Sequence, residues 1–187
     1  MTGNWVFICG PSGAGKDSVM AWARERLAGD ARIVFARRLV TRPAGPGSDD
    51  DEISAATLQA LREAGKIGFE WSAHGHAYAI AAHYAKDVDA GRVVVINGSR
   101  EHVAALPRQP QLRSVVVTAP LHTVAQRLQA RGRESARAVA ERIQRNMQLA
   151  QPQADLVIPN TGPLPQAGRQ LQSWLLALAH AQPAPLP

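Results

Sequence analysis

The residues whose types and spacing best indicate chemistry form a glycine-rich run near the start of the chain, Gly10-Pro11-Ser12-Gly13-Ala14-Gly15-Lys16. This run matches the first part of the P-loop pattern. Small residues let backbone N–H groups converge on an anion, and a helix that follows presents the positive end of its dipole. The Lys16 ammonium would reach the β- and γ-phosphates of a nucleoside triphosphate. The sequence therefore predicts a triphosphate site here, and a purely structural glycine turn is the alternative.

The next position departs from the P-loop pattern, which has a serine or threonine whose hydroxyl binds Mg²⁺. Here Asp17 occupies that position, and Ser18 follows it. A bare carboxylate beside a triphosphate would be repelled, whereas a carboxylate bound to Mg²⁺ would be attracted. We therefore predict that Asp17 is the metal ligand, directly or through a water. The alternative is that Asp17 only stabilises the start of the helix electrostatically.

A second cluster of chemistry-bearing residues is rich in arginine and lies in the last third of the chain. Arg127 and Arg131 are spaced i, i+4 on one helix face, Gly132 permits a turn, and Arg133 and Arg142 follow. Positive charges this close repel one another unless an anion lies among them. A segment of this kind could close over a transferring phosphoryl group and neutralise its oxygens. The alternative is a solvated basic helical hairpin.

No residue pattern indicates a general base, and no cluster of histidine or cysteine has metal-ligand spacing. A kinase that phosphorylates a hydroxyl usually needs a base. A kinase that phosphorylates a phosphate does not, because the acceptor oxygen is already an anion. The obstacle is then repulsion between donor and acceptor, which arginines and Mg²⁺ reduce. An anionic phosphate acceptor is therefore expected.

Composition sets the class of protein. The 187 residues are 45% hydrophobic, which fits one compact domain, and they contain no apolar run long enough to span a membrane. A net charge of +6 favours anionic partners, and only three of the 21 basic residues are lysines. The low aromatic content, 5%, argues against a single-strand nucleic-acid binder. The single cysteine, Cys9, cannot form an internal disulfide, so we expect a cytoplasmic protein.

The elements that must position these residues alternate along the chain. Strands are predicted at 4–9, 33–40, 93–96, 114–118 and 156–158, and helices at 17–27, 55–64, 101–106, 121–129, 136–149 and 166–181. Between them we expect a polar loop at 43–51, an irregular hairpin at 69–80 and a further helix that ends at residue 90. This alternation predicts an α/β fold with a parallel sheet covered on both faces. The acidic run at 49–52 is expected to be solvated, and the tail at 183–187 to be disordered.

The order of the motifs resembles the guanylate-kinase-like branch of the P-loop nucleoside monophosphate kinases. The glycine loop is followed by Thr41-Arg42-Pro43, by the segment from Gly75 to Tyr78, by the arginine segment and by Asn160. The resemblance implies a three-layer fold with a five-stranded parallel sheet, an acceptor-binding insertion at about 38–80 and a lid at about 127–142, all in one domain spanning 1–187. It also implies that Arg42 holds the acceptor phosphate and that Tyr78 lies in the acceptor pocket.

The departures from guanylate kinases form a pattern of their own. A second arginine expected three residues after Arg42 is replaced by Gly45, and Glu70 is one residue out of register with the guanine-reading carboxylate. The segments Gly15 to Ser18, Trp71 to Gly75 and Asn97-Gly98-Ser99-Arg100 instead resemble the ribose 1,5-bisphosphate phosphokinases of bacterial phosphonate catabolism. Without a base-reading carboxylate, a strong source of guanine selectivity is lost.

This second resemblance implies transfer of the γ-phosphoryl group of ATP, with Mg²⁺, to the 1-phosphate of ribose 1,5-bisphosphate. The implied ATP-binding residues are Gly10, Pro11, Ser12, Gly13, Ala14, Gly15, Lys16, Asp17 and Ser18. The implied catalytic residues are Lys16, Arg131, Arg133 and Arg142. The implied acceptor-binding residues are Arg42, Tyr78, Asn97, Ser99 and Arg100. The alternatives are another nucleotide kinase and a binding module without catalysis.

Overall fold

The computed structural model describes residues 2–43, 49–73, 75–130, 144 and 153–181. Its core is a five-stranded parallel sheet in the order β2-β7-β1-β8-β9, as predicted. The strands are β1 (Asn4–Cys9), β2 (Ile33–Phe35), β7 (Val93–Asn97), β8 (Leu112–Thr118) and β9 (Leu156–Pro159). The β-branched run of β7, Val93 to Ile96, is fully buried because both faces of this central strand are covered.

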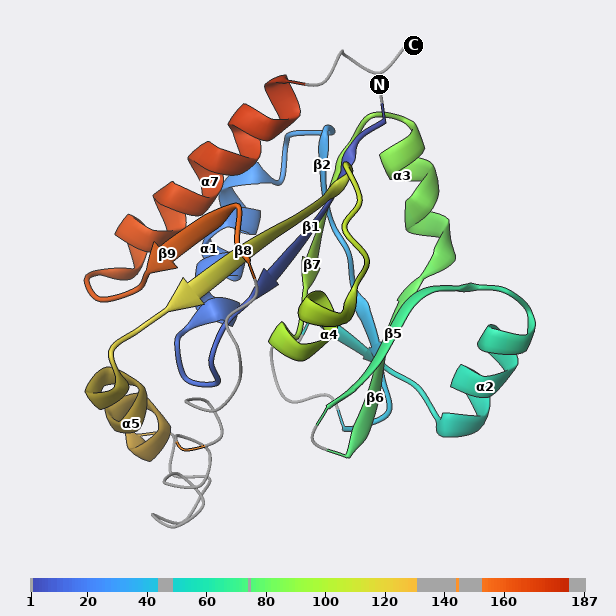
Figure 1. Ribbon diagram of the computed structural model, residues 1–187, viewed down its shortest axis with the longest axis horizontal. Helices are drawn as coiled ribbons and strands as arrows, with labels where there is room; N and C mark the ends of the chain where they lie inside the picture. The colour runs from blue at the N-terminus through green and yellow to red at the C-terminus, as the bar shows by residue number, and fades with distance from the viewer. Residues whose placement is uncertain (1, 44–48, 74, 131–143, 145–152, 182–187) are drawn as a thin grey trace.

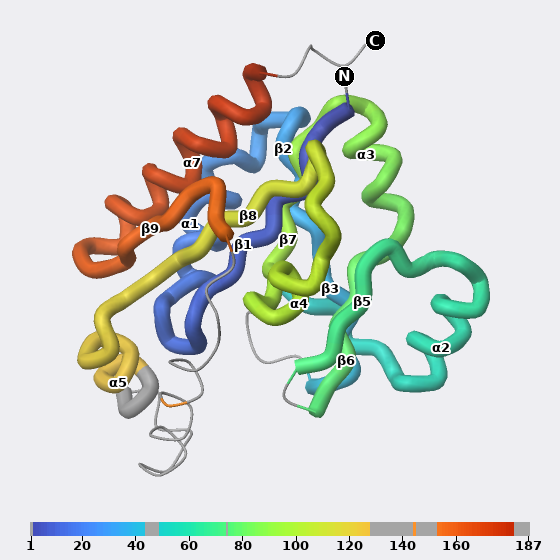
Figure 2. Tube along the Cα trace, viewed as in Figure 1, coloured from blue at the N-terminus to red at the C-terminus, as the bar shows by residue number. Residues whose placement is uncertain are grey.

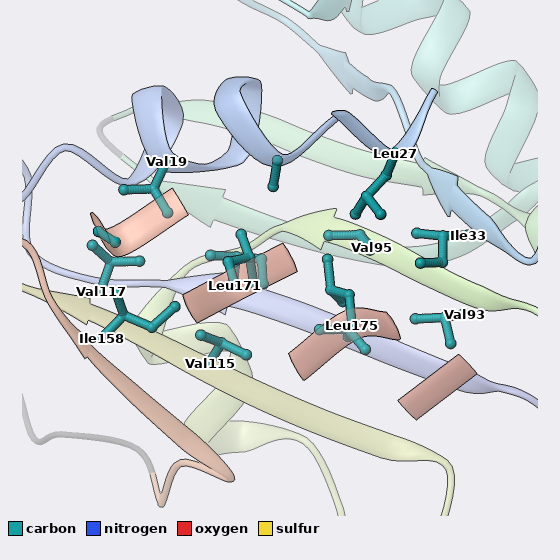
Figure 3. Packing of buried hydrophobic residues seen from close by; sticks show 14 of the residues in the cluster. Val19, Leu27, Ile33, Val93, Val95, Val115, Val117, Ile158, Leu171 and Leu175 are labelled. Carbon is teal, nitrogen blue, oxygen red and sulfur yellow. The ribbon is translucent and has the colours of Figure 1, made fainter. Parts of the chain in front are cut away.

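The side chains of β1 alternate between two hydrophobic cores. Val6 and Ile8 belong to the core on the face of the sheet that is covered by α1 (Lys16–Leu27) and α7 (Leu164–His180). Figure 1 shows the two helices, and Figure 3 shows Val19 of α1 and Leu171 of α7 in this core. Phe7 points to the opposite face, which is covered by α3 (Ala85–Asp89), by α4 (Arg100–Ala105) and by a second sheet. A 3-10 turn, η1 (Ala82–Tyr84), leads into α3. The three-layer arrangement predicted from the alternating pattern is confirmed.

The helices α1 and α7 pack closely because Gly168 has no side chain. A Cβ atom at residue 168 would lie 2.3 Å from the Trp22 ring of α1, so the indole occupies the place that a side chain would take. Arg26 lies one helical turn after Trp22 in α1, and its guanidinium is 3.9 Å from the centroid of the same ring. The helix that begins with Lys16 is therefore fixed against the C-terminal helix.

The second sheet has four strands in the order β4-β3-β6-β5 and carries the region where we expect the acceptor. Its strands are β3 (Arg38–Val40), β4 (Asp50–Glu52), β5 (Ile67–Ala73) and β6 (His76–Ala81), and α2 (Ala55–Glu63) lies between β4 and β5 in the chain. The predicted hairpin at 69–80 is confirmed as the antiparallel pair of β5 and β6.

Two details of this region were predicted wrongly. The strand expected over 33–40 is two strands in different sheets: Ala36 donates its N–H to Val95 O (2.9 Å) in the core, and Arg38 already pairs with Asp50. Residues 50–52, expected in a solvated loop, form β4. The hydrophobic periodicity of the sequence predicts neither the break between β2 and β3 nor the strand β4, because both depend on pairing with distant residues.

At the carboxyl ends of β1 and β8, the glycine loop lies between α5 (Leu121–Ala130) and the second sheet (Figure 2). Among the described residues, no helix is long and apolar enough to cross a membrane. The predicted helix at 136–149, the lid residues beyond 130 and the tail at 183–187 fall outside the described ranges.

Candidate active site

The glycine loop connects β1 to α1, the strand–loop–helix context that the motif requires. A Cβ atom at residue 10 would lie 2.2 Å from Val117 O of the neighbouring strand, so only glycine fits there. Gly15 has a φ of 86°, a conformation that L-residues rarely adopt, and a Cβ there would lie 2.4 Å from Asn160 Nδ2. The loop's glycines are therefore dictated by its backbone path, which brings the start of α1 to the carboxyl edge of the sheet.

Lys16, Asp17 and Asn97 form one hydrogen-bonded group at the start of α1. The Lys16 ammonium donates to Asp17 Oδ1 (2.8 Å) and to Asn97 Oδ1, and Asn97 Nδ2 donates to Asp17 Oδ1 (2.7 Å). The Lys16 charge, with desolvation acting against it, lowers the pKa of the Asp17 carboxyl to about 2. Burial lowers the pKa of Lys16, whose side chain is only 15% exposed. A polyphosphate would supply the negative charge that favours the ammonium form of Lys16.

Asp17 is the described residue best placed to hold Mg²⁺. Its carboxylate is 72% exposed beside the glycine loop, and the hydroxyl of exposed Ser18 follows it. Mg²⁺ in nucleotide enzymes is usually held by one or two carboxylates together with phosphate oxygens and waters. Among the described residues no group of three or more histidine, cysteine, aspartate or glutamate side chains could hold a metal. The residues present therefore fit a Mg²⁺ ion shared with a bound polyphosphate.

Two residues that are far away in the sequence brace the glycine loop from behind. Asn160 Nδ2 donates to Ala14 O (2.8 Å), and Arg127 Nη1 donates to the same carbonyl oxygen (3.1 Å). Arg127 Nη2 also donates to Asn160 O (3.2 Å), so the two residues are joined to each other. Sequence reasoning placed Arg127 in a lid and gave Asn160 no role. The position of Asn160 directly after β9, at the carboxyl edge of the sheet, is the sequence signal from which its contact with the glycine loop could have been predicted.

The acceptor side is built around a buried carboxylate. Asp50 Oδ1 accepts from Arg38 Nε (2.8 Å), and Asp50 Oδ2 accepts from Arg38 Nη2 (3.1 Å) and from Arg42 Nη2 (2.7 Å). The Asp50 side chain is 5% exposed, so the expectation that residues 49–52 are all solvated was wrong for this residue. Two guanidinium groups compensate the burial of its charge. Arg38 was not predicted from the sequence as a residue of this site.

Tyr78 and Arg42, the first two residues that the resemblance implies for the acceptor site, lie in contact with each other. Arg42 Nε donates to Tyr78 Oη (3.3 Å), and the Tyr78 ring stacks on Trp71, with centroids 5.8 Å apart and planes at 9°. Trp71 in turn stacks on His102 at 4.8 Å, and it is 8% exposed. The aromatic stack therefore forms part of the core and presents the Tyr78 hydroxyl to the arginines.

Asn97, Ser99 and Arg100 occupy the end of β7 and the start of α4. Ser99 precedes α4 at its cap position, but its side chain makes no capping hydrogen bond. The Arg100 side chain is buried, with the residue 4% exposed, and burial lowers its pKa. Asn97 contacts two parts of the site: its side chain accepts from Lys16, and its backbone carbonyl accepts from Arg38 Nη1 (3.3 Å). Arg131, Arg133 and Arg142 lie outside the described residues.

Comparisons with known proteins agree with this geometry. A family model described as an AAA domain matches residues 6–148. The chain is 45% identical over 173 residues to the ribose 1,5-bisphosphate phosphokinase PhnN of Chelativorans sp. (strain BNC1), covering 90% of this chain and 82% of that protein. It is 42% identical over 184 residues to the protein of the same name from Laribacter hongkongensis, of which it spans 44% of the length, with 96% of this chain covered.

A solved structure supports the fold independently. The guanylate kinase of Anaplasma phagocytophilum superimposes with a TM-score of 0.66 at 16% identity, covering 94% of this chain and 86% of that one. At this identity the likeness concerns the fold alone. Because the Chelativorans protein is 45% identical over 90% of this chain and 82% of its own length, and the family model matches residues 6–148, the chain belongs to the ribose 1,5-bisphosphate phosphokinase family of P-loop kinases.

Proposed function

We propose that this chain transfers the γ-phosphoryl group of ATP to the 1-phosphate of ribose 1,5-bisphosphate, giving 5-phosphoribosyl 1-diphosphate and ADP. An oxygen of the 1-phosphate attacks the γ-phosphorus, and the bond from that phosphorus to the oxygen bridging it to the β-phosphate breaks. No proton has to leave the attacking oxygen, which is anionic at neutral pH. In support, Lys16, Arg38 and Arg42 are the described residues that lie where we propose the two phosphates to bind, and the attacking oxygen needs no histidine or carboxylate base.

The observation that carries this proposal is the position of Asn97. Its side chain bonds Lys16 of the glycine loop, and its carbonyl accepts from Arg38 of the acceptor cluster. A phosphate held by the glycine loop and one held by the arginines of β3 and its neighbours would thus meet on either side of this residue. Holding two anions in line is the main task of a phosphoryl-transfer catalyst, because little covalent chemistry is left to the protein.

The implied residues form four groups, and each group has its own role in this scheme. Lys16 and the loop amides bind the β- and γ-phosphates, and Asp17 holds Mg²⁺, which neutralises charge on the phosphates when bound. Arg42, Tyr78, Asn97, Ser99 and Arg100 orient the sugar phosphate. We propose that the lid arginines Arg131, Arg133 and Arg142 stabilise the transferring group and exclude water.

The pairing of Glu70 favours the sugar over a nucleotide acceptor. Glu70, the carboxylate nearest in sequence to the position that reads guanine in guanylate kinases, accepts from Arg62 Nη2 (2.5 Å) and Nε (3.1 Å). This pair joins α2 to β5. Glu70 is adjacent to Trp71, the strand partner of Tyr78, so its side chain points to the opposite face of the sheet from Tyr78. We further propose that the protein acts in the cytoplasm on small molecules rather than on nucleic acid.

The test is an assay of ADP release with ribose 1,5-bisphosphate and with GMP at equal concentrations, each with and without ATP and Mg²⁺. Turnover with the sugar bisphosphate, and formation of the diphosphate sugar by ³¹P NMR, would support the proposal. Turnover with GMP alone would replace it with a guanylate kinase. Absence of both, together with no thermal stabilisation by ATP, would indicate a binding module, since a ligand of the native state raises the melting temperature.

The role of Asp17 has its own test. In Asp17→Ser, which restores the residue common at this position, the Mg²⁺ concentration for half-maximal rate should change several-fold. Asp17→Asn, which keeps the shape but removes the charge, should raise that concentration. An unchanged Mg²⁺ requirement in both variants would rule out the metal role and leave only the contacts with Lys16 and Asn97.

A further inference from the structure

Two arginine–aspartate pairs lie side by side in the second sheet but differ in burial. Arg37 and Asp51 form an exposed pair, with side chains 50% and 45% exposed and Nη2 of the arginine 2.6 Å from Oδ1. Arg38 and Asp50 form a buried pair, 14% and 5% exposed, with 2.8 Å between Nε and Oδ1. Asp50 and Asp51 are successive residues of β4, so their side chains point to opposite faces: Asp51 meets Arg37 at the surface, and Asp50 is buried between Arg38 and Arg42.

The buried pair does not use all the hydrogen-bonding capacity of its arginine. Arginine has five N–H donors. Arg38 directs one Nε and one Nη2 donor at Asp50 and one Nη1 donor at Asn97 O, which leaves one N–H on each terminal nitrogen without a partner among the described residues. Two such N–H groups on one guanidinium match two oxygens of a phosphate.

Arg42 is arranged in the same way. It donates to Asp50 Oδ2 (2.7 Å), to Tyr78 Oη (3.3 Å) and to Pro43 O (3.1 Å), and it also retains two N–H groups without a partner in the described part of the chain. The guanidinium carbons of Arg38 and Arg42 lie 5.3 and 5.9 Å from the Tyr78 ring centroid. One carboxylate and one aromatic ring therefore fix two guanidinium groups next to each other.

The charge of this group favours an anion. Two guanidinium charges and one carboxylate leave a net positive charge in a half-desolvated place, where electrostatic attraction is stronger than in bulk water. Asn97 connects Arg38 to Lys16, and Arg42 donates to the Tyr78 hydroxyl. We call Arg38, Arg42 and the Asp50 carboxylate between them the cradle, and Asn97 connects this cradle to Lys16 of the glycine loop.

We propose that Arg38 is a second ligand of the acceptor's 1-phosphate, acting together with Arg42, and that Asp50 is the positioning residue that holds both guanidinium groups. This inference rests on the proposed function and specifies its acceptor site. Asp50 itself does not bind the phosphate, since both its oxygens accept from arginine. The cradle selects a phosphate acceptor by two fixed forks, whereas a hydroxyl acceptor would leave them unpaired.

The test compares Arg38→Gln and Arg38→Lys with the matched control Arg37→Gln, which removes the neighbouring exposed guanidinium. In Arg38→Gln the KM for ribose 1,5-bisphosphate should rise by about 10- to 100-fold, as expected for a lost charge-assisted hydrogen-bond pair. The KM for ATP should stay within about twofold, and Arg38→Lys should recover part of the loss. Arg37→Gln should change neither constant by more than about twofold.

Two results would overturn the inference. One is an unchanged KM for the sugar in Arg38→Gln. The other is an equal rise in both KM values with a lower melting temperature, which would mean that Arg38 only supports the fold. If the wild type fails to turn over the sugar, the proposed function fails instead. Calorimetric titration with inorganic phosphate in the presence of ADP then decides the role of Arg38: weaker binding in Arg38→Gln than in Arg37→Gln supports it, and equal binding refutes it.

Discussion

The proposed donor and acceptor sides of this site are built in different ways. The proposed donor side is one contiguous loop, Gly10 to Lys16, in which backbone N–H groups would bind the phosphates and whose shape depends on glycine. The acceptor side is assembled from side chains of β3, β4 and β6 and of the loop after β3, around the buried carboxylate of Asp50. A backbone site tolerates little change in its own segment, whereas a side-chain site depends on distant partners. The two sides should therefore respond differently to substitution.

The largest effect is expected at Lys16, whose ammonium we propose to bind the transferring phosphate directly. Lys16→Met should lower kcat by about a thousandfold, because no other described group can replace an ammonium at the transferring phosphate. Its fold should be retained, since methionine fills the same space without a buried charge. Steady-state kinetics and thermal unfolding measured on the same sample check both halves of this expectation, and a modest loss of kcat would contradict it.

On the acceptor side, Asp50→Asn should destabilise the protein by about 2–4 kcal/mol, because two partly buried guanidinium groups lose their shared counter-charge. The matched variant Asp51→Asn, which breaks the exposed pair with Arg37, should cost less than about 1 kcal/mol. Urea denaturation of the two variants gives the difference directly. Equal losses would show that burial does not distinguish the two pairs.

Loss of the hydrogen bond from Asn160 to the glycine loop should affect the donor side and leave the acceptor side unchanged. In Asn160→Ala, the buried Ala14 carbonyl loses its 2.8 Å donor and keeps only Arg127. We expect a cost of about 1–2 kcal/mol in the free energy of unfolding and a higher KM for ATP, with the KM for the acceptor unchanged. Asn160→Asp, which keeps the shape but cannot donate, should behave like Asn160→Ala. A rise in both KM values would mean that the brace serves the two sides together.

The smallest effect concerns the aromatic stack beneath the acceptor cluster. Burial lowers the pKa of His102, so the folded state binds a proton less readily than the unfolded state, where His102 titrates near its usual 6.5. Stability contributed by the neutral ring is therefore present above that pH and is lost as the pH falls below it. His102→Phe should reduce the change in melting temperature between pH 7.5 and 5.5. An unchanged pH profile would assign the acid sensitivity to other groups.

The sequence was most informative where one local segment determines the structure. The strands predicted at 4–9 and 93–96 and the glycine loop between a strand and a helix each required only their own residues, and all three lie where they were predicted. Arg38 and Asp50 were missed because their meaning depends on the pairing of β3 with β4, which brings residues 12 apart into contact. The run of acidic residues at 49–52 has the composition of a solvated loop. One of those residues, Asp50, is buried because Arg38 and Arg42 donate hydrogen bonds to its carboxylate.

Gly168 has a consequence for mutational studies of this enzyme family. It lies on α7, away from the glycine loop, yet any larger residue there would meet the Trp22 ring and push against the helix whose first residue is Lys16. Inactive clones from a random screen would therefore include changes at this position that resemble nucleotide-site defects. Second-site suppression separates the two cases: a smaller side chain at residue 22 should restore Gly168→Ala and should not restore a Lys16 variant.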